Sequence, residues 1–277
     1  MDWRLLREVS RSFYLTIRLL PAPVRETIAL GYLLARASDS IADTSAARLD
    51  ARRSALEGLR RGEIDSQAVA ELAKQQTAEA ERVLVGRLPE LVALAKASPD
   101  RERLEWVWDR ILRGQLFDLT RFDDRSDPLS PEELDEYVFL VAGCVGEFWT
   151  RLCADRLPEF SKRDCSEMTA DAIRYGKGLQ LVNILRDRAA DAANDRIYVS
   201  AERFDEVRRL AFDHLEAGWR WVRAVGVGRV RFACVIPLRI GAKTLARCHA
   251  DSGSVKVRRA EVRRILLESL PTLWLRP

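Results

Sequence analysis

Two sets of acidic side chains are spaced so that each could hold a metal ion. In the first set, steps of four, three, four and four residues separate Gly176, Gln180, Asn183, Asp187 and Asp191. These steps match the helical period of about 3.6 residues, so the five residues are expected on one face of a helix. Two carboxylates one turn apart repel each other, and a divalent cation between them reverses that repulsion. Because Mg²⁺ is usually held by one or two carboxylates together with substrate phosphate, the pattern predicts a site for both.

A second acidic set occurs about 150 residues upstream. There Tyr32, Arg36, Asp39 and Asp43 again follow helical spacing. Apolar residues occupy the other faces of both helices, which is not the pattern of a helix on the protein surface. A solvated helix face would explain either acidic pair alone. The repetition of the pair on two apolar helices favours a metal site over that alternative.

The composition is that of a large helical protein. The chain has 277 residues, 47% of them hydrophobic and 32% charged, which is enough to bury a large core. Helix-forming residues dominate and alternating β-branched runs are scarce, so we predict an all-α fold in a single domain over residues 1–277. The 46 basic and 42 acidic residues nearly balance, at a net charge of +4, and no nucleic-acid partner is expected.

Helical periodicity, prolines and capping residues divide the chain into predicted helices. Their ranges are 2–20, 24–43, 50–61, 66–85, 89–97, 101–122, 131–155, 166–190, 202–223, 230–249 and 254–269. Pro21 and Pro23 end the first helix, and Pro237 is expected to kink the tenth. Ser130 and Pro131, followed by two glutamates, form a strong helix start.

Cysteine spacing and the N-terminal sequence bear on the cellular compartment. The chain contains Cys144, Cys153, Cys165, Cys234 and Cys248. Their spacing fits neither a zinc site nor a disulfide framework, so we expect buried thiols in a reducing compartment. The first residues, MDWRLLREVSRSF, lack the apolar segment of a signal peptide. No uninterrupted apolar run approaches the roughly 18 residues of a membrane span, and we predict a cytoplasmic location.

Small and polar residues elsewhere leave structural explanations open. Ala142, Gly143 and Gly146 on one predicted helix allow close approach of a neighbouring helix or of a slender ligand. Gln115 and Asp118 share a face of helix 101–122 and form either a polar edge or a substrate contact.

Two other features do not predict a site. The Gly226–Gly228 stretch lacks the preceding strand of a phosphate loop and is interpreted as a turn between helices. His214 and His249 have no metal-ligand partners at useful spacing and are interpreted as surface or capping residues.

Four stretches together carry a family resemblance. They are SRSF at 10–13, YLLARASDSIAD at 32–43, YVFLVAGCVG at 137–146, and GLQLVNILRDRAAD at 178–191 with RIY at 196–198. The chain resembles the squalene/phytoene synthases, head-to-head (1′–1) prenyl synthases with the all-helical isoprenoid synthase fold. The resemblance implies a helical bundle in which two acidic helices face each other across a central cavity.

The resemblance also implies roles for individual residues. Mg²⁺, or Mn²⁺ in its place, would be held by Asp39, Asp43, Asp187, Asp191 and Asn183. Substrate diphosphate would be bound by Ser10, Arg11, Arg36, Gln180, Asn183, Arg186 and Arg196, since a guanidinium fork suits phosphate geometry. Tyr137 resembles the tyrosine assigned to proton handling or to stabilising a cation.

The final step of the implied reaction has two alternatives. A squalene synthase reduces the presqualene diphosphate intermediate with NADPH, whereas phytoene and dehydrosqualene synthases lose a proton. The segment Val255–Arg259, VKVRR, resembles the VKIRK segment associated with NADPH binding in squalene synthases. We therefore expect Lys256, Arg258 and Arg259 to bind NADPH and squalene to be made from two farnesyl diphosphates, for sterol or hopanoid biosynthesis.

The resemblance further bears on partners. A non-catalytic relative is disfavoured because all four aspartates are present. No counterpart of the C-terminal membrane helix of eukaryotic squalene synthases is recognised, so peripheral contact with the inner face of the membrane is the form of membrane association expected. The expected oligomeric state is a monomer or a weak homodimer.

Overall fold

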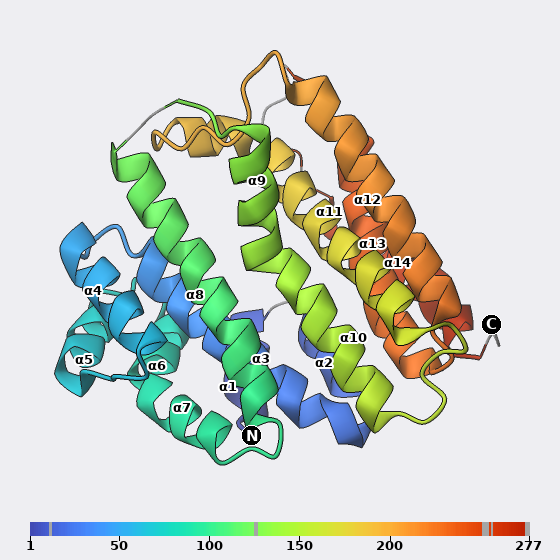
Figure 1. Cartoon of the computed structure of the whole chain (residues 1–277), viewed down its shortest axis with the longest axis horizontal. Coiled ribbons are helices and arrows are strands. Elements are labelled where there is room, and N and C mark those ends of the chain that lie inside the picture. Colours follow the sequence, from blue (N-terminus) through green and yellow to red (C-terminus); the bar gives the residue numbers. More distant parts are fainter. Residues whose placement is uncertain (11–12, 125–126, 251–254, 256, 275–277) are drawn as a thin grey trace. The chain divides into compact units, whose positions relative to one another are not determined.

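The computed structural model of the chain describes residues 1–10, 13–124, 127–250, 255 and 257–274, and it is helical throughout (Figure 1). Within these residues no β-strand forms, and a single isolated bridge joins Ser161 to Val225. The prediction of an all-α fold is therefore confirmed. Arg11 and Lys256, two of the predicted site residues, lie outside the described residues.

The chain divides into two compact units. One comprises residues 1–18 and 22–121, and the other comprises residues 19–21 and 122–277. The prediction of a single domain stays a prediction, because a division into compact units does not decide whether they fold together. Each unit is described by itself below.

The first unit is arranged around a long helix, α3 (Ala22–Asp43). Its other helices are α1 (Trp3–Ser10), most of α2 (Phe13–Leu19), α4 (Leu49–Arg60), α5 (Ser66–Lys74), α6 (Glu79–Gly86), α7 (Leu88–Lys96) and nearly all of α8 (Arg101–Asp124). Helices α1, α4, α6 and α7 pack against α3. Leu30, Leu33, Leu34 and Ile41 are buried, so the apolar faces of α3 form core and the helix does not lie on the surface.

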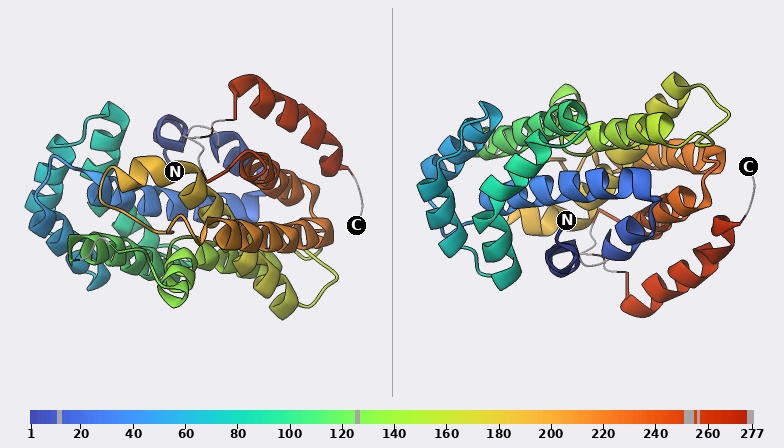
Figure 2. Two further views of the ribbon diagram at one scale, coloured as in Figure 1. Left: turned by 90° about the horizontal axis from the view of Figure 1, so that it is seen from above. Right: turned by 90° about the horizontal axis from the view of Figure 1, so that it is seen from below.

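The second unit contains the other acidic helix, α11 (Cys165–Ala192), together with its neighbours. These are α9 (Pro131–Val138), the π-helical turn η1 (Phe139–Gly143), α10 (Cys144–Arg156), α12 (Phe204–Ala224), α13 (Gly228–Leu245), α14 (Arg259–Ser269) and the 3₁₀ turn η2 (Leu270–Leu273). Helices α10 and α12 flank α11, and α13 packs against α12 (Figure 1). Figure 2 shows α14, in red, beside α13.

Three predicted helices differ from the structure: the helix predicted over 254–269 begins only at Arg259, and the other two lie earlier in the chain. The prediction of one helix over residues 66–85 was wrong, because α5 ends at Lys74 and α6 begins at Glu79. The Gln76 side chain, between the two, donates to the carbonyl of Leu72 at 3.2 Å and so returns to the helix that has just ended. The predicted helix 131–155 is continuous but contains η1, a wide turn of five residues.

Other expectations about helix ends are confirmed. Ser130 forms the capping box with Glu133, whose backbone N–H donates to the serine hydroxyl at 3.1 Å. Gly226 lies in the turn between α12 and α13. Helix α13 runs through Pro237, and the expected kink at that residue stays a prediction.

Glycines bring α11 against η1 and α10 at backbone distance. A Cβ atom added at Gly146 would lie 2.1 Å from the carbonyl oxygen of Ala172, and one added at Gly176 would lie 2.3 Å from that of Ala142. Only glycine fits at such distances. Of the two explanations left open for these small residues, the structure supports a neighbouring helix, and Gly176 is a packing residue.

The cysteines and one apolar helix relate to the predictions of buried free thiols and of no membrane span. No disulfide forms among the described residues, and Cys165 is exposed whereas the other four cysteines are buried. The helical stretch Pro131–Arg156 is the one described stretch with the length and hydropathy of a membrane span, and half of its most apolar window is buried. Glu147 and Arg151, an ion pair at 2.8 Å, interrupt its apolar sequence.

Candidate functional site

The acidic set of the first unit is bound to an arginine. On α3, Arg36 donates one short hydrogen bond to the carboxylate of Asp39 and another to that of Glu81, which lies on α6. The spacing on α3 places Arg36 and Asp39 one turn apart, and packing of α6 on α3 supplies the second acid. The guanidinium is thus shared between two carboxylates, and sequence spacing indicated only one of them.

The Asp39 carboxylate has an unusual charge environment. Its side chain is 42% exposed. Burial among the surrounding atoms and the nearby Asp43 carboxylate raise the pKa of Asp39 to about 6, against the lowering effect of Arg36. The repulsion between the two carboxylates is the interaction that a divalent cation would relieve, and their oxygen atoms are ligands that Mg²⁺ prefers.

The end of α3 that carries Asp43 is held by polar contacts. The buried amide nitrogen of Gln76 lies 2.5 Å from the Thr44 hydroxyl and 3.2 Å from the Ser40 carbonyl. From α4, Arg52 donates to the carbonyl of Ala42 at 2.6 Å. These bonds satisfy groups that the end of a helix leaves without intrahelical partners. Gln76 and Glu81 were not predicted, because each acts through a residue distant in sequence.

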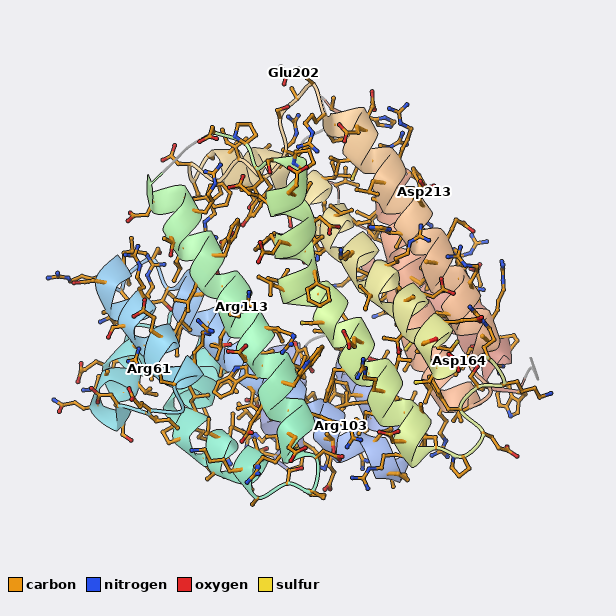
Figure 3. All side chains as sticks on the ribbon, in the orientation of Figure 1. Arg61, Arg103, Arg113, Asp164, Glu202 and Asp213 are labelled. Carbon is orange, nitrogen blue, oxygen red and sulfur yellow. The ribbon has the colours of Figure 1, made fainter. Side chains whose placement is uncertain are left out.

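On α11, too, an arginine is paired with a carboxylate of the acidic set. Arg186 donates two hydrogen bonds to Asp187, one of them from Nε to Oδ1 at 2.8 Å. One turn earlier, the Asn183 amide nitrogen donates to the Gln180 side-chain oxygen at 3.4 Å. About a third of each side chain of the ion pair is exposed. Helix α11 begins with Asp164 as its N-cap, at the opposite end from the stripe (Figure 3).

The chain turns sharply after α11. The carbonyl of Asp191 accepts hydrogen bonds from the backbone N–H groups of Asn194 at 2.9 Å and Arg196 at 3.0 Å. Between them Asp195 has a φ of 59°, a left-handed conformation that Asp and Asn adopt more readily than most residues. The turn therefore fixes the backbone of Arg196 next to that of Asp191.

An aromatic cluster joins α9 to the segment after α11. The rings of Tyr137 and Tyr198 stack with centroids 5.2 Å apart, and the ring of Phe122 meets Tyr198 edge-on at 4.9 Å. The two tyrosine hydroxyls lie 3.5 Å apart, at the long limit for a hydrogen bond. Both tyrosines are buried. Tyr137 was predicted as a site residue, whereas Tyr198 entered only as part of the RIY stretch.

Other predicted residues lie in different environments. Ser10 is buried, and its hydroxyl donates to the carbonyl of Leu6 at 2.5 Å within α1. Gln115 on α8 is buried, and its side-chain oxygen has no hydrogen-bond partner in the described structure. Arg258 and Arg259 are exposed at the start of α14, where the backbone N–H of Arg258 donates to Glu261 at 3.0 Å.

The residues present fit Mg²⁺ more completely than they fit NADPH. Each acidic helix offers two carboxylates and, on α11, amide oxygens, which is a donor set for Mg²⁺ when substrate phosphate completes it. No cluster of three or more acidic, histidine or cysteine side chains suited to a metal occurs within the described residues. Arg258 and Arg259 suit the phosphate groups of a dinucleotide. The described part of their segment offers a nicotinamide ring only Val255 and Val257.

Comparison with known proteins identifies relatives over most of the chain. The family model described as "Squalene/phytoene synthase" matches residues 6–209. A "Bifunctional lycopene cyclase/phytoene synthase" of Gibberella fujikuroi is 31% identical over 201 residues, covering 70% of this chain and 34% of that protein. A "Presqualene diphosphate synthase" of Rhodopseudomonas palustris is 30% identical over 211 residues, covering 73% of this chain and 62% of that protein. The chain spans about a third of the length of the first of these relatives.

A solved structure shares the fold. The complex of TcSQS with the ligand BPH1237 superposes with a TM-score of 0.74 at 18% identity, covering 96% of this chain and 84% of that one. At this identity the likeness concerns the arrangement of the helices alone.

Proposed function

Because the chain belongs to the squalene/phytoene synthase family, we propose that it joins two prenyl diphosphates head to head. The observation that carries the proposal is the recurrence of one device on two buried helices: a carboxylate pair with an arginine hydrogen-bonded to one member. Arg36 with Asp39 and Arg186 with Asp187 are the two instances. A diphosphate is the substrate group that needs both cationic side chains and metal-binding acids.

In the proposed reaction the arginines bind and orient the diphosphates. Arg36 and Arg186 already hold carboxylates, so each would share its guanidinium between an acid and a phosphate oxygen when substrate binds. Mg²⁺ held by Asp39, Asp43, Asp187, Asp191 and Asn183 would supply positive charge that neutralises the leaving diphosphate. Loss of diphosphate from the first substrate leaves an allylic cation. The double bond of the second substrate attacks this cation, and loss of a proton gives a cyclopropylcarbinyl diphosphate.

Aromatic side chains would protect the cationic intermediates. The faces of Tyr137 and Tyr198 carry the negative potential that attracts a cation, and their burial excludes water that would otherwise quench it. The distance of 3.5 Å between the Tyr137 and Tyr198 hydroxyl oxygens supports a role for this pair in proton transfer. Tyr137 is therefore the residue to which we assign proton handling.

For the product we propose squalene, formed when the second ionisation is followed by hydride transfer from NADPH. The VKVRR segment at 255–259 supports this choice. The phytoene synthases among the relatives favour a second candidate, in which the rearranged cation loses a proton and no reducing cofactor is needed. The presqualene diphosphate synthase among them favours an enzyme that releases the cyclopropyl intermediate.

Product analysis distinguishes these candidates. The purified chain would be incubated with Mg²⁺ and either farnesyl or geranylgeranyl diphosphate, with and without NADPH, and the products identified by mass spectrometry. Squalene formed only with NADPH supports the preferred product. Dehydrosqualene or phytoene in both tubes supports proton loss, and accumulation of presqualene diphosphate supports release of the intermediate. Absence of any 1′–1 product from either substrate would contradict the proposed function.

A further inference from the structure

The side chain of Lys177 on α11 extends along the wide turn η1, which joins α9 to α10 (Figure 1). A Cβ atom added at Gly143, the last residue of the turn, would lie 3.2 Å from Cγ of Lys177. The Lys177 ammonium lies 5.7 Å from the ring centroid of Phe139, the first residue of the turn. It also donates to the carboxylate of Asp135 on α9 at 2.7 Å. One side chain of α11 therefore lies against both ends of the turn and reaches the helix before it.

The charge of Lys177 is largely withdrawn from water. Its side chain is 13% exposed, and Asp135 is its one ion-pair partner among the described residues. Removing an ammonium group from water is costly unless it is paired, and the face of the Phe139 ring adds a second attraction for a cation. An apolar side chain of similar length would fill the space beside Gly143 without this cost. The lysine therefore indicates that the charge has a task here, which is to join α11 to Asp135 and Phe139.

The two residues that Lys177 holds lie on either side of Tyr137. Asp135 precedes Tyr137 by two residues, and Phe139 follows it by two. The turn that begins at Phe139 is π-helical, a form that is rare in proteins and occurs frequently at functional sites. Contacts on both sides of Tyr137 limit the movement of its backbone relative to α11, so they also limit the positions that its ring can take.

We propose that Lys177 is a positioning residue that holds the ring of Tyr137 against Tyr198. The proposal rests on the proposed function, in which Tyr137 handles a proton, and Lys177 acts through that tyrosine. The two tyrosines are buried, with ring centroids 5.2 Å apart. Without the Lys177 charge, α9 loses its ion pair with α11 and η1 loses the cation on its first ring. The hydroxyl of Tyr137 then spends less time in the productive geometry, which lowers the rate.

Nuclear magnetic resonance of the full chain with isotope-labelled tyrosine tests the positioning without any substrate. The chain contains five tyrosines, and Tyr137→Phe identifies the signal of Tyr137. That signal depends on the neighbouring Tyr198 ring, so we expect Lys177→Met, which removes the charge and keeps the length of the side chain, to move it. An unchanged Tyr137 signal in folded Lys177→Met would overturn the proposal. If that variant does not fold, Asp135→Asn at the 61% exposed partner decides by the same criterion.

A double-mutant cycle shows whether the positioning reaches the reaction. We expect Lys177→Met to lower kcat about tenfold with little change in KM, because proton transfer depends on the placement of the group that carries it out. In a Tyr137→Phe background the hydroxyl is already absent, so Lys177→Met should cause no further loss. Equal losses in both backgrounds would show that Lys177 supports only the fold, and this result would also overturn the proposal.

A lysine in an ion pair with none of these residues is the matched control. Lys74→Met on α5 breaks a pair with Glu71 at 2.8 Å and should change neither the Tyr137 signal nor kcat. A wild type that forms no head-to-head product would refute the proposed function. The Tyr137 signal would still decide whether Lys177 holds the ring, so the two failures are distinguishable.

Discussion

The hydroxyl oxygens of Tyr137 and Tyr198 lie 3.5 Å apart and their rings stack with centroids 5.2 Å apart, although 61 residues separate them in the chain. Tyr198 is therefore placed to orient Tyr137. We expect Tyr198→Phe to keep the ring stacking and the fold, and to lower kcat by about three- to tenfold through loss of one weak hydrogen bond. Steady-state kinetics with the prenyl diphosphate substrate would measure this effect, with little change in KM.

The same substitution at Tyr175 provides the control. Its hydroxyl donates to the buried carbonyl of Cys234 at 2.7 Å, and Tyr137 is not its hydrogen-bond partner. Tyr175→Phe should cost about 1 kcal/mol of unfolding free energy and leave kcat unchanged. An unchanged kcat in Tyr198→Phe would show that Tyr198 has only a packing role.

Replacement of Asp187 tests the acidic stripe on α11. Asp187→Asn keeps the shape of the side chain but removes the charge needed to bind a divalent cation beside Asp191. We expect kcat to fall by at least about 100-fold. The fold should persist, because the Arg186–Asp187 pair is a third exposed and such pairs contribute little to stability.

Asp213, exposed on the neighbouring helix α12, supplies a matched charge change (Figure 3). Asp213→Asn should leave both kcat and the Mg²⁺ concentration for half-maximal activity unchanged. Near-normal turnover of Asp187→Asn in Mg²⁺ would refute the assignment of this residue to the metal.

Gly176 fixes the distance between α11 and η1. In Gly176→Ala the new methyl group would lie 2.3 Å from the carbonyl oxygen of Ala142, and neither backbone can yield without separating the helices. We expect a loss of about 3 kcal/mol in unfolding free energy, measured by chemical denaturation. Gly86→Ala, whose methyl group would meet nothing closer than 3.9 Å, should be neutral or stabilising by about 0.5 kcal/mol. Equal stability of the two variants would contradict the close approach.

Gln76 should stabilise the first unit. Its buried amide nitrogen lies within hydrogen-bond distance of the Ser40 carbonyl, the Thr44 hydroxyl and the Leu72 carbonyl. Gln76→Ala would leave buried acceptors unsatisfied, and we expect a loss of about 2 kcal/mol in unfolding free energy. Gln67→Ala, at an exposed position on α5, should change stability by less than about 0.5 kcal/mol. A Gln76→Ala protein as stable as Gln67→Ala would exclude a structural role for these bonds.

His214 should make stability depend on pH. Contrary to its interpretation as a surface or capping residue, it is half-buried, and burial together with Arg174 and Lys177 lowers its pKa from 6.5 to about 4. The unfolded chain therefore binds a proton that the folded chain does not between pH 6.5 and 4. Stability from this group is present above pH 6.5 and is lost as the pH falls toward 4, by about 1–2 kcal/mol after allowing for solvent screening.

Denaturation of wild type and His214→Gln across this pH range would measure the contribution. The difference in unfolding free energy between the two proteins should change with pH below 6.5 and stay constant above it. A difference that does not vary with pH would show that His214 titrates normally.

The features that local spacing determines could be predicted from the sequence. The acidic stripes were visible because Asp39 and Asp187 each belong to a periodic pattern on one apolar helix, and both helices formed where expected. Gly146 was recognised as a point of close approach because glycine inside a helix requires a reason. The glycine does not indicate which helix approaches it, so only the structure identifies α11 as the neighbour of Gly146.

Features that depend on contacts between distant segments could not be predicted. Glu81 and Tyr198 show no local signal, since their importance comes from the residues that folding places against them. The break between α5 and α6 was missed because the sequence there contains neither proline nor glycine, and the turn is supported instead by the buried side chain of Gln76. The roles assigned to Ser10 and Arg258 remain predictions.

The wide turn at Phe139–Gly143 has a consequence for evolution within the family. A π-helical turn holds one residue more than an α-helical turn, so it changes the phase between the parts of a helix on its two sides by about 100°. Tyr137 precedes this turn and the packing residue Gly146 follows it. Deletion of a single residue here would rotate the tyrosine while the glycine contact with α11 stayed in place. A one-residue gap at this point in an alignment of homologues therefore marks a change in the orientation of the tyrosine and is not a sign of misalignment.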